Sequence, residues 1–135
     1  MPKWTIDEAR EHYNINGWGL GYFDINTQGN IVVRLNRQKQ HDIDLKVLVD
    51  DIQSKGYSLP TLIRFSDILK ASIANLANSF QRAIEEHKYD GQYHGVYPIK
   101  VNQQRQVVEE IVKFGQPYNI GLEAGSKPEL HAILA

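Results

Sequence analysis

Strand-like and helix-like segments alternate three times in the second half of the chain, and this limits the possible folds more than any other feature. Apolar and β-branched runs at 61–65, 93–101 and 118–123 are typical of strands. A helical pattern follows each run, ending near Tyr89, at Gly115 and at the last residue. Such alternation predicts consecutive right-handed βαβ units sharing a parallel sheet.

The number of these units indicates part of a larger fold. Ser126 and Glu129 form a capping box, and the sequence stops at Ala135, one or two turns into the helix behind it. A complete (β/α) barrel takes about 250 residues, so three units are too few to close one. We therefore expect an α/β chain containing the first three units of an incomplete (β/α)8 barrel, and a piece of a longer protein.

The first 58 residues follow another pattern and form a separate expected segment, with the barrel part at 59–135 after a fresh start at Pro60. Glycines at 17, 19 and 21 are expected to break the first helix. The expected elements are a helix at 5–13 behind a Thr5–Glu8 capping box, a β-hairpin of 22–25 and 31–35, and a helix at 42–55 with Gly56 at its end.

Composition excludes several classes of function. The net charge of −1 arises from 15 basic and 16 acidic residues spread along the chain, which argues against a nucleic-acid or membrane partner. With no cysteine, disulfides, thiolate metal sites and cysteine nucleophiles are excluded. No two of the five histidines are three or four residues apart, so no local metal site is predicted. A cytoplasmic location is the default expectation.

Lys100 is the residue with the most informative position, because it closes a predicted parallel strand just before a helix. Active sites of barrels and open α/β sheets lie at that end of the strands. A buried or half-buried lysine amine has a lowered pKa and can attack an aldehyde such as that of pyridoxal phosphate (PLP). The alternative is a lysine that only closes the strand, with its ammonium group in water.

The residues around Lys100 favour the first of these interpretations. Val96-Tyr97-Pro98-Ile99-Lys100-Val101-Asn102-Gln103 resembles the cofactor-lysine segment of PLP-dependent decarboxylases with an alanine-racemase-like barrel. The segment 121–130, Gly-Leu-Glu-Ala-Gly-Ser-Lys-Pro-Glu-Leu, resembles the next strand of that group. The Tyr-Pro-Ile-Lys-Val-Asn-Gln form, together with residues 4–24 and 59–69, is similar to the biosynthetic arginine decarboxylase family.

The resemblance implies a function and a cofactor. Lys100 would hold PLP covalently, and L-arginine would be converted to agmatine and CO2 in polyamine (spermidine) biosynthesis, with PLP as electron sink. Full members are several times longer, use magnesium, and combine a TIM-type barrel with a β-rich domain, which residues 1–58 would join. Their phosphate-binding loop and the acidic partner of the pyridine nitrogen come from later barrel strands. They also use residues of a second subunit. The chain is thus expected to need its own remainder and a homo-oligomer, and to be inactive alone.

Four other residues are secondary candidates. Glu123 matches an acidic position that approaches the cofactor in related decarboxylases; the alternative is a capping or solvent-facing carboxylate. His94 would share a strand face with Lys100 and contact the cofactor, or it is a structural histidine. Asn102 is expected to cap the turn into the next helix. Arg64 would meet an anion at the first barrel strand, or form an ordinary salt bridge.

Two rival functions remain open. One is a PLP-binding barrel without a reaction, although such proteins lack the preceding 58 residues. The other is a structural module without cofactor, in which unpaired sheet edges would favour dimerisation or aggregation. A dinucleotide loop at Gly17, Gly19 and Gly21 is excluded by its spacing. The aromatic residues near the start are expected to be core and domain-packing residues: Trp4, Trp18, Tyr22 and Phe23.

Overall fold

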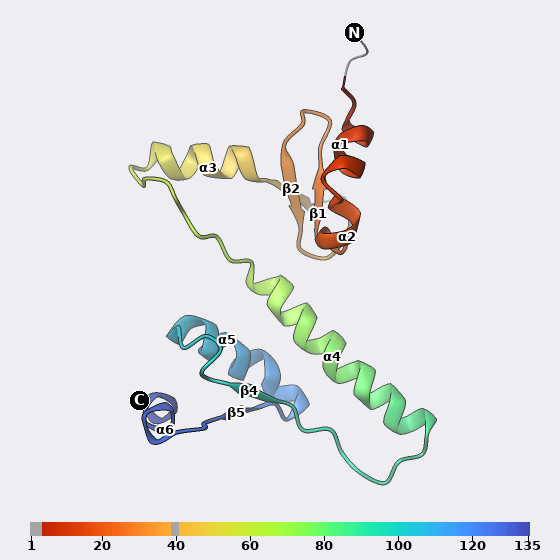
Figure 1. The fold of residues 1–135 in the computed structure, drawn as a ribbon, viewed down its shortest axis with the longest axis vertical. Helices are drawn as coiled ribbons and strands as arrows, with labels where there is room; N and C mark the ends of the chain where they lie inside the picture. Colours follow the sequence, from red (N-terminus) through yellow and green to blue (C-terminus); the bar gives the residue numbers. More distant parts are fainter. Residues whose placement is uncertain (1–3, 39–40) are drawn as a thin grey trace. The chain divides into compact units, whose positions relative to one another are not determined.

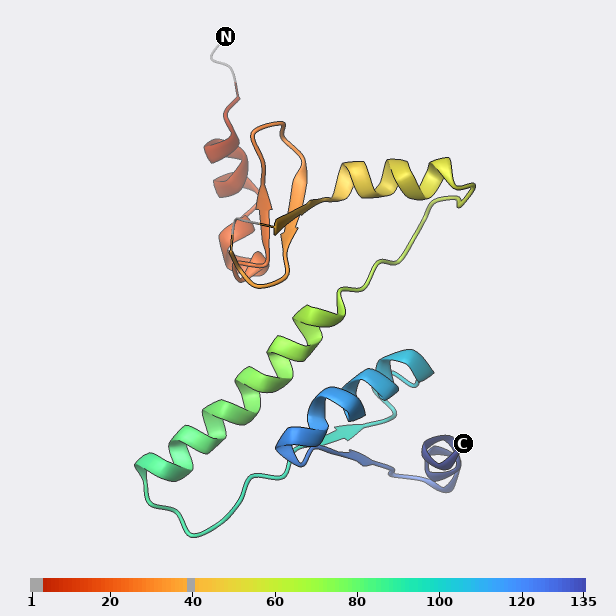
Figure 2. The same ribbon diagram turned by 180° about the vertical axis from the view of Figure 1, so that it is seen from behind.

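The structure, a computed structural model, describes residues 4–38 and 41–135. It divides into two compact units, Met1–Phe65 and Ser66–Ala135 (Figures 1 and 2). The first unit contains a three-stranded sheet and the second a two-stranded one. Of the helices in the described residues, none is long and apolar enough to span a membrane.

The first unit opens with two short helices. α1 spans Ile6–His12, and the predicted capping box is confirmed, with Thr5 accepting from the Glu8 amide at 3.2 Å and Glu8 accepting from the Thr5 amide at 2.7 Å. The glycine segment was expected to break this helix, and α1 does end at His12, after which a second helix, α2, occupies Ile15–Gly19. α2 forms despite the weak helix propensity of glycine because packing favours it: Ile15 is 2% exposed, and Gly19 allows close approach to Phe23.

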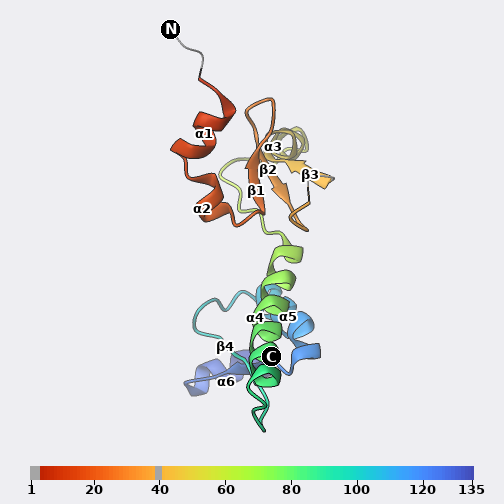
Figure 3. The same ribbon diagram turned by 90° about the vertical axis from the view of Figure 1, so that its right-hand side faces the viewer.

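Three antiparallel strands form the sheet of this unit: β1 (Phe23–Ile25), β2 (Ile31–Arg34) and β3 (Asp42–Asp44). Figure 3 shows α1 and α2 beside β1. Residues 42–44 were expected to begin a helix, but they pair with β2, and α3 (Leu45–Ser54) starts only after them. The reason is local: the Asp44 carboxylate accepts the amides of Lys46 and Val47, which fixes the helix start.

Burial in the first unit centres on the sheet. Val32 and Val33 are 1% and 0% exposed. Tyr22 is buried as expected, whereas Trp4 and Trp18 are 63% and 50% exposed and so do not lie in the core of this unit; their expected packing against another domain stays a prediction. An indole can satisfy its N–H at the surface, and Trp18 donates to the Tyr13 carbonyl at 3.0 Å.

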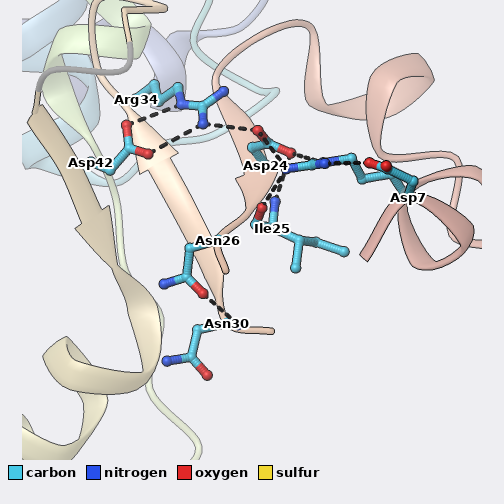
Figure 4. Close-up of polar contacts among 8 residues, drawn as sticks. Asp7, Asp24, Ile25, Asn26, Asn30, Arg34 and Asp42 are labelled. Atoms are coloured by element: carbon cyan, nitrogen blue, oxygen red, sulfur yellow. Dashed lines mark hydrogen bonds and ion pairs between the residues drawn. The ribbon is translucent and has the colours of Figure 1, made fainter. Parts of the chain in front are cut away.

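A charged network joins four elements of this unit. Asp24 of β1 is 9% exposed and accepts from Arg10 of α1 at 2.6 Å. Arg34 of β2 lies 2.8 Å from the other Asp24 oxygen and 3.0 Å from Asp42 of β3. Figure 4 shows Asp24 at the middle of this row, with Asp7 at one end and Asp42 at the other. Because the carboxylate is paired on both sides, its burial is compensated.

The protonation of Asp24 is set by two opposing effects. Burial alone would raise the pKa of its carboxyl, but hydrogen bonds from Arg10 and the Ile25 amide, with the charges of Arg10 and Arg34, lower the pKa below its usual value. The pKa of Glu8 is lowered by hydrogen bonds from Thr5, and that of Asp44 by hydrogen bonds, the largest from Asn30. All three carboxylates therefore favour the folded state when ionised.

We expect Asp24→Asn to lower the free energy of unfolding of the first unit by roughly 1.5–3 kcal/mol, because two arginines lose a charged acceptor. Asp7→Asn removes another acceptor of Arg10, but its side chain is 89% exposed, so it should cost less than about 1 kcal/mol. Urea unfolding followed by tryptophan fluorescence checks this, since both tryptophans of the chain lie in this unit. Equal effects of the two variants would contradict the central role of Asp24.

The same unit should lose stability in acid. A lowered folded pKa adds stability above the unfolded value of about 4, and this is lost as pH falls through the lower folded value. The urea midpoint of the fluorescence transition should therefore drop between about pH 5 and about pH 2. Asp24→Asn should make the drop shallower; an unchanged slope in that variant would assign the acid sensitivity to other groups.

The second unit has two parallel strands between helices. Its elements are α4 (Ser66–Glu86), β4 (Val96–Pro98), α5 (Arg105–Gly115), the 3-10 turn Gln116–Tyr118, β5 (Gly121–Glu123) and α6 (Lys127–Leu134). β4 and β5 pair in parallel, with Tyr97 opposite Leu122, so the parallel arrangement predicted for these strands is confirmed, although both are shorter than predicted. The return from α5 is tight: a Cβ on Gly115 would lie 2.7 Å from that of Ile120.

The strand predicted at 61–65 is not formed. Residues 61–65 belong to neither sheet, and Leu62 is 72% exposed. An apolar run becomes a strand only when another strand pairs with it, and in the described residues no strand pairs with this one. Arg64 consequently does not stand at the end of a strand. The observed α/β fold is compatible with a partial barrel, and the described residues do not close one.

Candidate functional site

Lys100 lies in a tight turn at the carboxyl end of β4. The strand ends at Pro98, and the Val101 amide donates to the Pro98 carbonyl at 3.1 Å, which places Ile99 and Lys100 at the centre of the turn. α5 begins at Arg105. The lysine thus has the position that the sequence predicts, after a parallel strand and before a helix, where α/β folds place their active sites.

The two central residues of this turn have opposite environments. Ile99 is 2% exposed and anchors the turn in the core, whereas Lys100 is exposed. A buried or half-buried lysine was expected from the chemistry, so this expectation is not met within the 135 residues. The physical reason is that a two-stranded sheet is too narrow to surround a side chain at its edge.

Glu123 lies at the same edge as Lys100. It is the last residue of β5, stands opposite Pro98 in the parallel register and is half-buried. Its carbonyl accepts the Ile99 amide at 3.1 Å, so the ladder continues one step past β4. The structure therefore brings the turn that contains Lys100 and the acidic residue of the next strand to adjoining positions.

His94 and Asn102 lie on either side of β4. His94 is exposed and precedes β4, which covers only three residues, so strand alternation does not connect it to Lys100. Asn102 was expected to cap the turn into the next helix, and its side chain accepts the Gln104 amide at 3.0 Å in the turn that leads into α5. The N-cap residue of α5 itself is Gln104.

Two contacts near the site were not predicted. The Tyr97 hydroxyl donates to the Asn102 carbonyl at 3.3 Å, across the turn that contains Lys100. Beyond β5, the Glu129 carboxylate accepts the Gly125 amide at 2.6 Å. The predicted cap itself is present, with Ser126 accepting the Glu129 amide at 3.4 Å, and this capping pattern was a sequence signal for a contact of Glu129 near the helix start. No pattern signals the first, which depends on turn geometry.

The described residues do not group side chains that could bind a metal ion. Within residues 4–38 and 41–135, no set of three or more histidine, aspartate or glutamate side chains could hold a metal ion. The chemistry available at the carboxyl edge of β4 and β5 is thus that of one amine and one carboxylate.

No protein-family model matches this chain. Among curated proteins, the relatives found are decarboxylases of amino acids, and the chain is similar to this class along its full length. In particular it resembles biosynthetic arginine decarboxylases: identity is 55% to that of Gloeobacter violaceus, 51% to that of Phocaeicola vulgatus and 50% to that of Citrifermentans bemidjiense, each over 135 residues. The family resemblance inferred from the sequence is confirmed, and the chain spans 21% of the length of these relatives.

The anchoring of the turn can be tested on either side of Lys100. Ile99→Ala should lower the free energy of unfolding of the second unit by roughly 2–5 kcal/mol, because it leaves a cavity at a buried site. Val101, at 69% exposed, provides the control, and Val101→Ala should stay within about 0.5 kcal/mol. Hydrogen exchange of the β4 and β5 amides measures both effects, and similar protection in the two variants would refute the anchoring role of Ile99.

Proposed function

We propose that this chain is the N-terminal part of a PLP-dependent decarboxylase that converts L-arginine to agmatine and CO2, and that Lys100 holds the cofactor. The observation that supports this most directly is Lys100 in the turn at the carboxyl end of β4. The similarity of the whole chain to proteins named biosynthetic arginine decarboxylase supports the substrate.

The residues at this edge fit one end of the cofactor. PLP presents an aldehyde, a phosphate and a ring nitrogen, and the Lys100 amine is suited to the aldehyde. Glu123 is the acidic group at the same edge and would help to orient the ring. The Gly125 amide already donates to Glu129, so it is not assigned to the phosphate. Partners for the phosphate and the ring nitrogen are therefore assigned to the remainder of the full protein.

Within this proposal the chain's own residues have limited tasks. When bound, PLP supplies an electron sink for the carbanion that remains after CO2 leaves. Lys100 would hold the cofactor through its amine, and the same amine would be suited to move a proton to or from the substrate. His94 is exposed and lies outside β4, so we assign it no role in this part of the protein.

The 135-residue chain alone is proposed to be inactive toward arginine. It spans 21% of its relatives, and the phosphate and ring-nitrogen partners are not supplied by the edge described above. The acidic groups that select a guanidinium, the magnesium site and a partner subunit are likewise proposed to belong to the rest of the protein. Agmatine formed by this chain, and lost in Lys100→Ala, would overturn the proposal.

In the full-length protein, Lys100→Ala should reduce arginine decarboxylation by a hundredfold or more, on the order of the loss of a positioned catalytic group. Lys46→Ala should leave the rate unchanged, because Lys46 forms only an exposed pair with Asp50 on α3. Release of labelled CO2 from L-arginine measures the rate. PLP bound at Lys100 without any CO2 release would favour a cofactor-binding protein of another function.

A further inference from the structure

We propose that Tyr97 is a positioning residue for Lys100, acting through the hydroxyl group that bridges the turn. The inference rests on the proposed function, since it gives Tyr97 a role only if Lys100 must present its amine to a cofactor. It concerns a contact between β4 and the segment before α5, within the second unit.

The turn is already held at its base. The Ile99 amide donates to the Glu123 carbonyl at 3.1 Å, and the Val101 amide donates to the Pro98 carbonyl at 3.1 Å. With Ile99 2% exposed, the first half of the turn is fixed in the core. The second half, from Lys100 onward, is exposed, and burial does not restrain it.

The Tyr97 hydroxyl restrains this second half. It donates to the Asn102 carbonyl at 3.3 Å, closing a ring of chain around residues 98–101. Asn102 is in turn fixed by its own side chain, which accepts the Gln104 amide at 3.0 Å at the start of α5. The chain is therefore restrained by hydrogen bonds both before and after Lys100, although the Lys100 side chain itself is exposed.

The position of Tyr97 in the sheet makes this restraint stiff. Tyr97 is half-buried and its backbone pairs with Leu122 of β5, so the parallel ladder fixes the backbone from which the side chain extends. An O–H···O bond of 3.3 Å is longer than the usual spacing of about 2.8 Å, so it adds little stability. Its effect is on direction: catalytic groups need restraint to within about 0.5 Å of the productive geometry.

The test compares Tyr97→Phe with Tyr89→Phe in the full-length protein. Tyr89 is 66% exposed in the same unit, so its variant makes the same chemical change without touching the turn. Each protein is mixed with PLP and reduced with borohydride, and mass spectrometry gives the label on Lys100 relative to that on the exposed Lys127. This internal ratio reports positioning, and a general loss of stability would not change it selectively.

We expect Tyr97→Phe to lower the Lys100 to Lys127 labelling ratio roughly twofold, at the weak end of the effect of one hydrogen bond, with little change in the melting temperature. Tyr89→Phe should match the parent protein. An unchanged ratio in Tyr97→Phe, while Lys100→Ala removes the selective label, would overturn the positioning role and leave the proposed function intact. If the parent protein shows no selective label at Lys100, the proposed function itself fails.

Discussion

The parallel pairing of β4 with β5 is the constraint on which the candidate site depends. It places the turn after β4 next to the last residue of β5, so that Lys100 and Glu123 reach one edge from segments on either side of a helix. Parallel strands require a crossover, and α5 provides it. The close contact of Gly115 with Ile120 allows the chain to turn back at once, so the geometry of the site follows from a packing detail at the opposite end of the strand.

The first unit is organised by charge as much as by apolar packing. Arg10, Asp24, Arg34 and Asp42 connect a helix and three strands, each of which is too short to be stable alone. Guanidinium groups suit this task, because their planar donors can bridge two carboxylates at fixed angles. The described residues of the whole chain contain no buried side-chain nitrogen or oxygen without a hydrogen-bond partner, which agrees with a network that compensates its own burial.

Sequence patterns predicted the features that depend on local residues. The helical period of α4 and α5, the Thr5–Glu8 cap and the position of Lys100 between strand and helix were all available from spacing alone. The missed features depend on distant partners. β3 exists because β2 lies beside it, and 61–65 is no strand because no described neighbour pairs with it. The exposure of Lys100 and the Tyr97 contact likewise depend on what surrounds the turn, which periodicity does not describe.

The turn after β4 also limits how this segment can vary in length. Ile99 points into the core and Lys100 out of it because the Pro98–Val101 hydrogen bond fixes their order. One residue more or less between the strand and α5 would exchange inward and outward positions, burying an ammonium group and exposing an isoleucine. The fold can therefore accept substitutions at the exposed positions of this segment, whatever their effect on function, but insertions and deletions within it would be poorly tolerated.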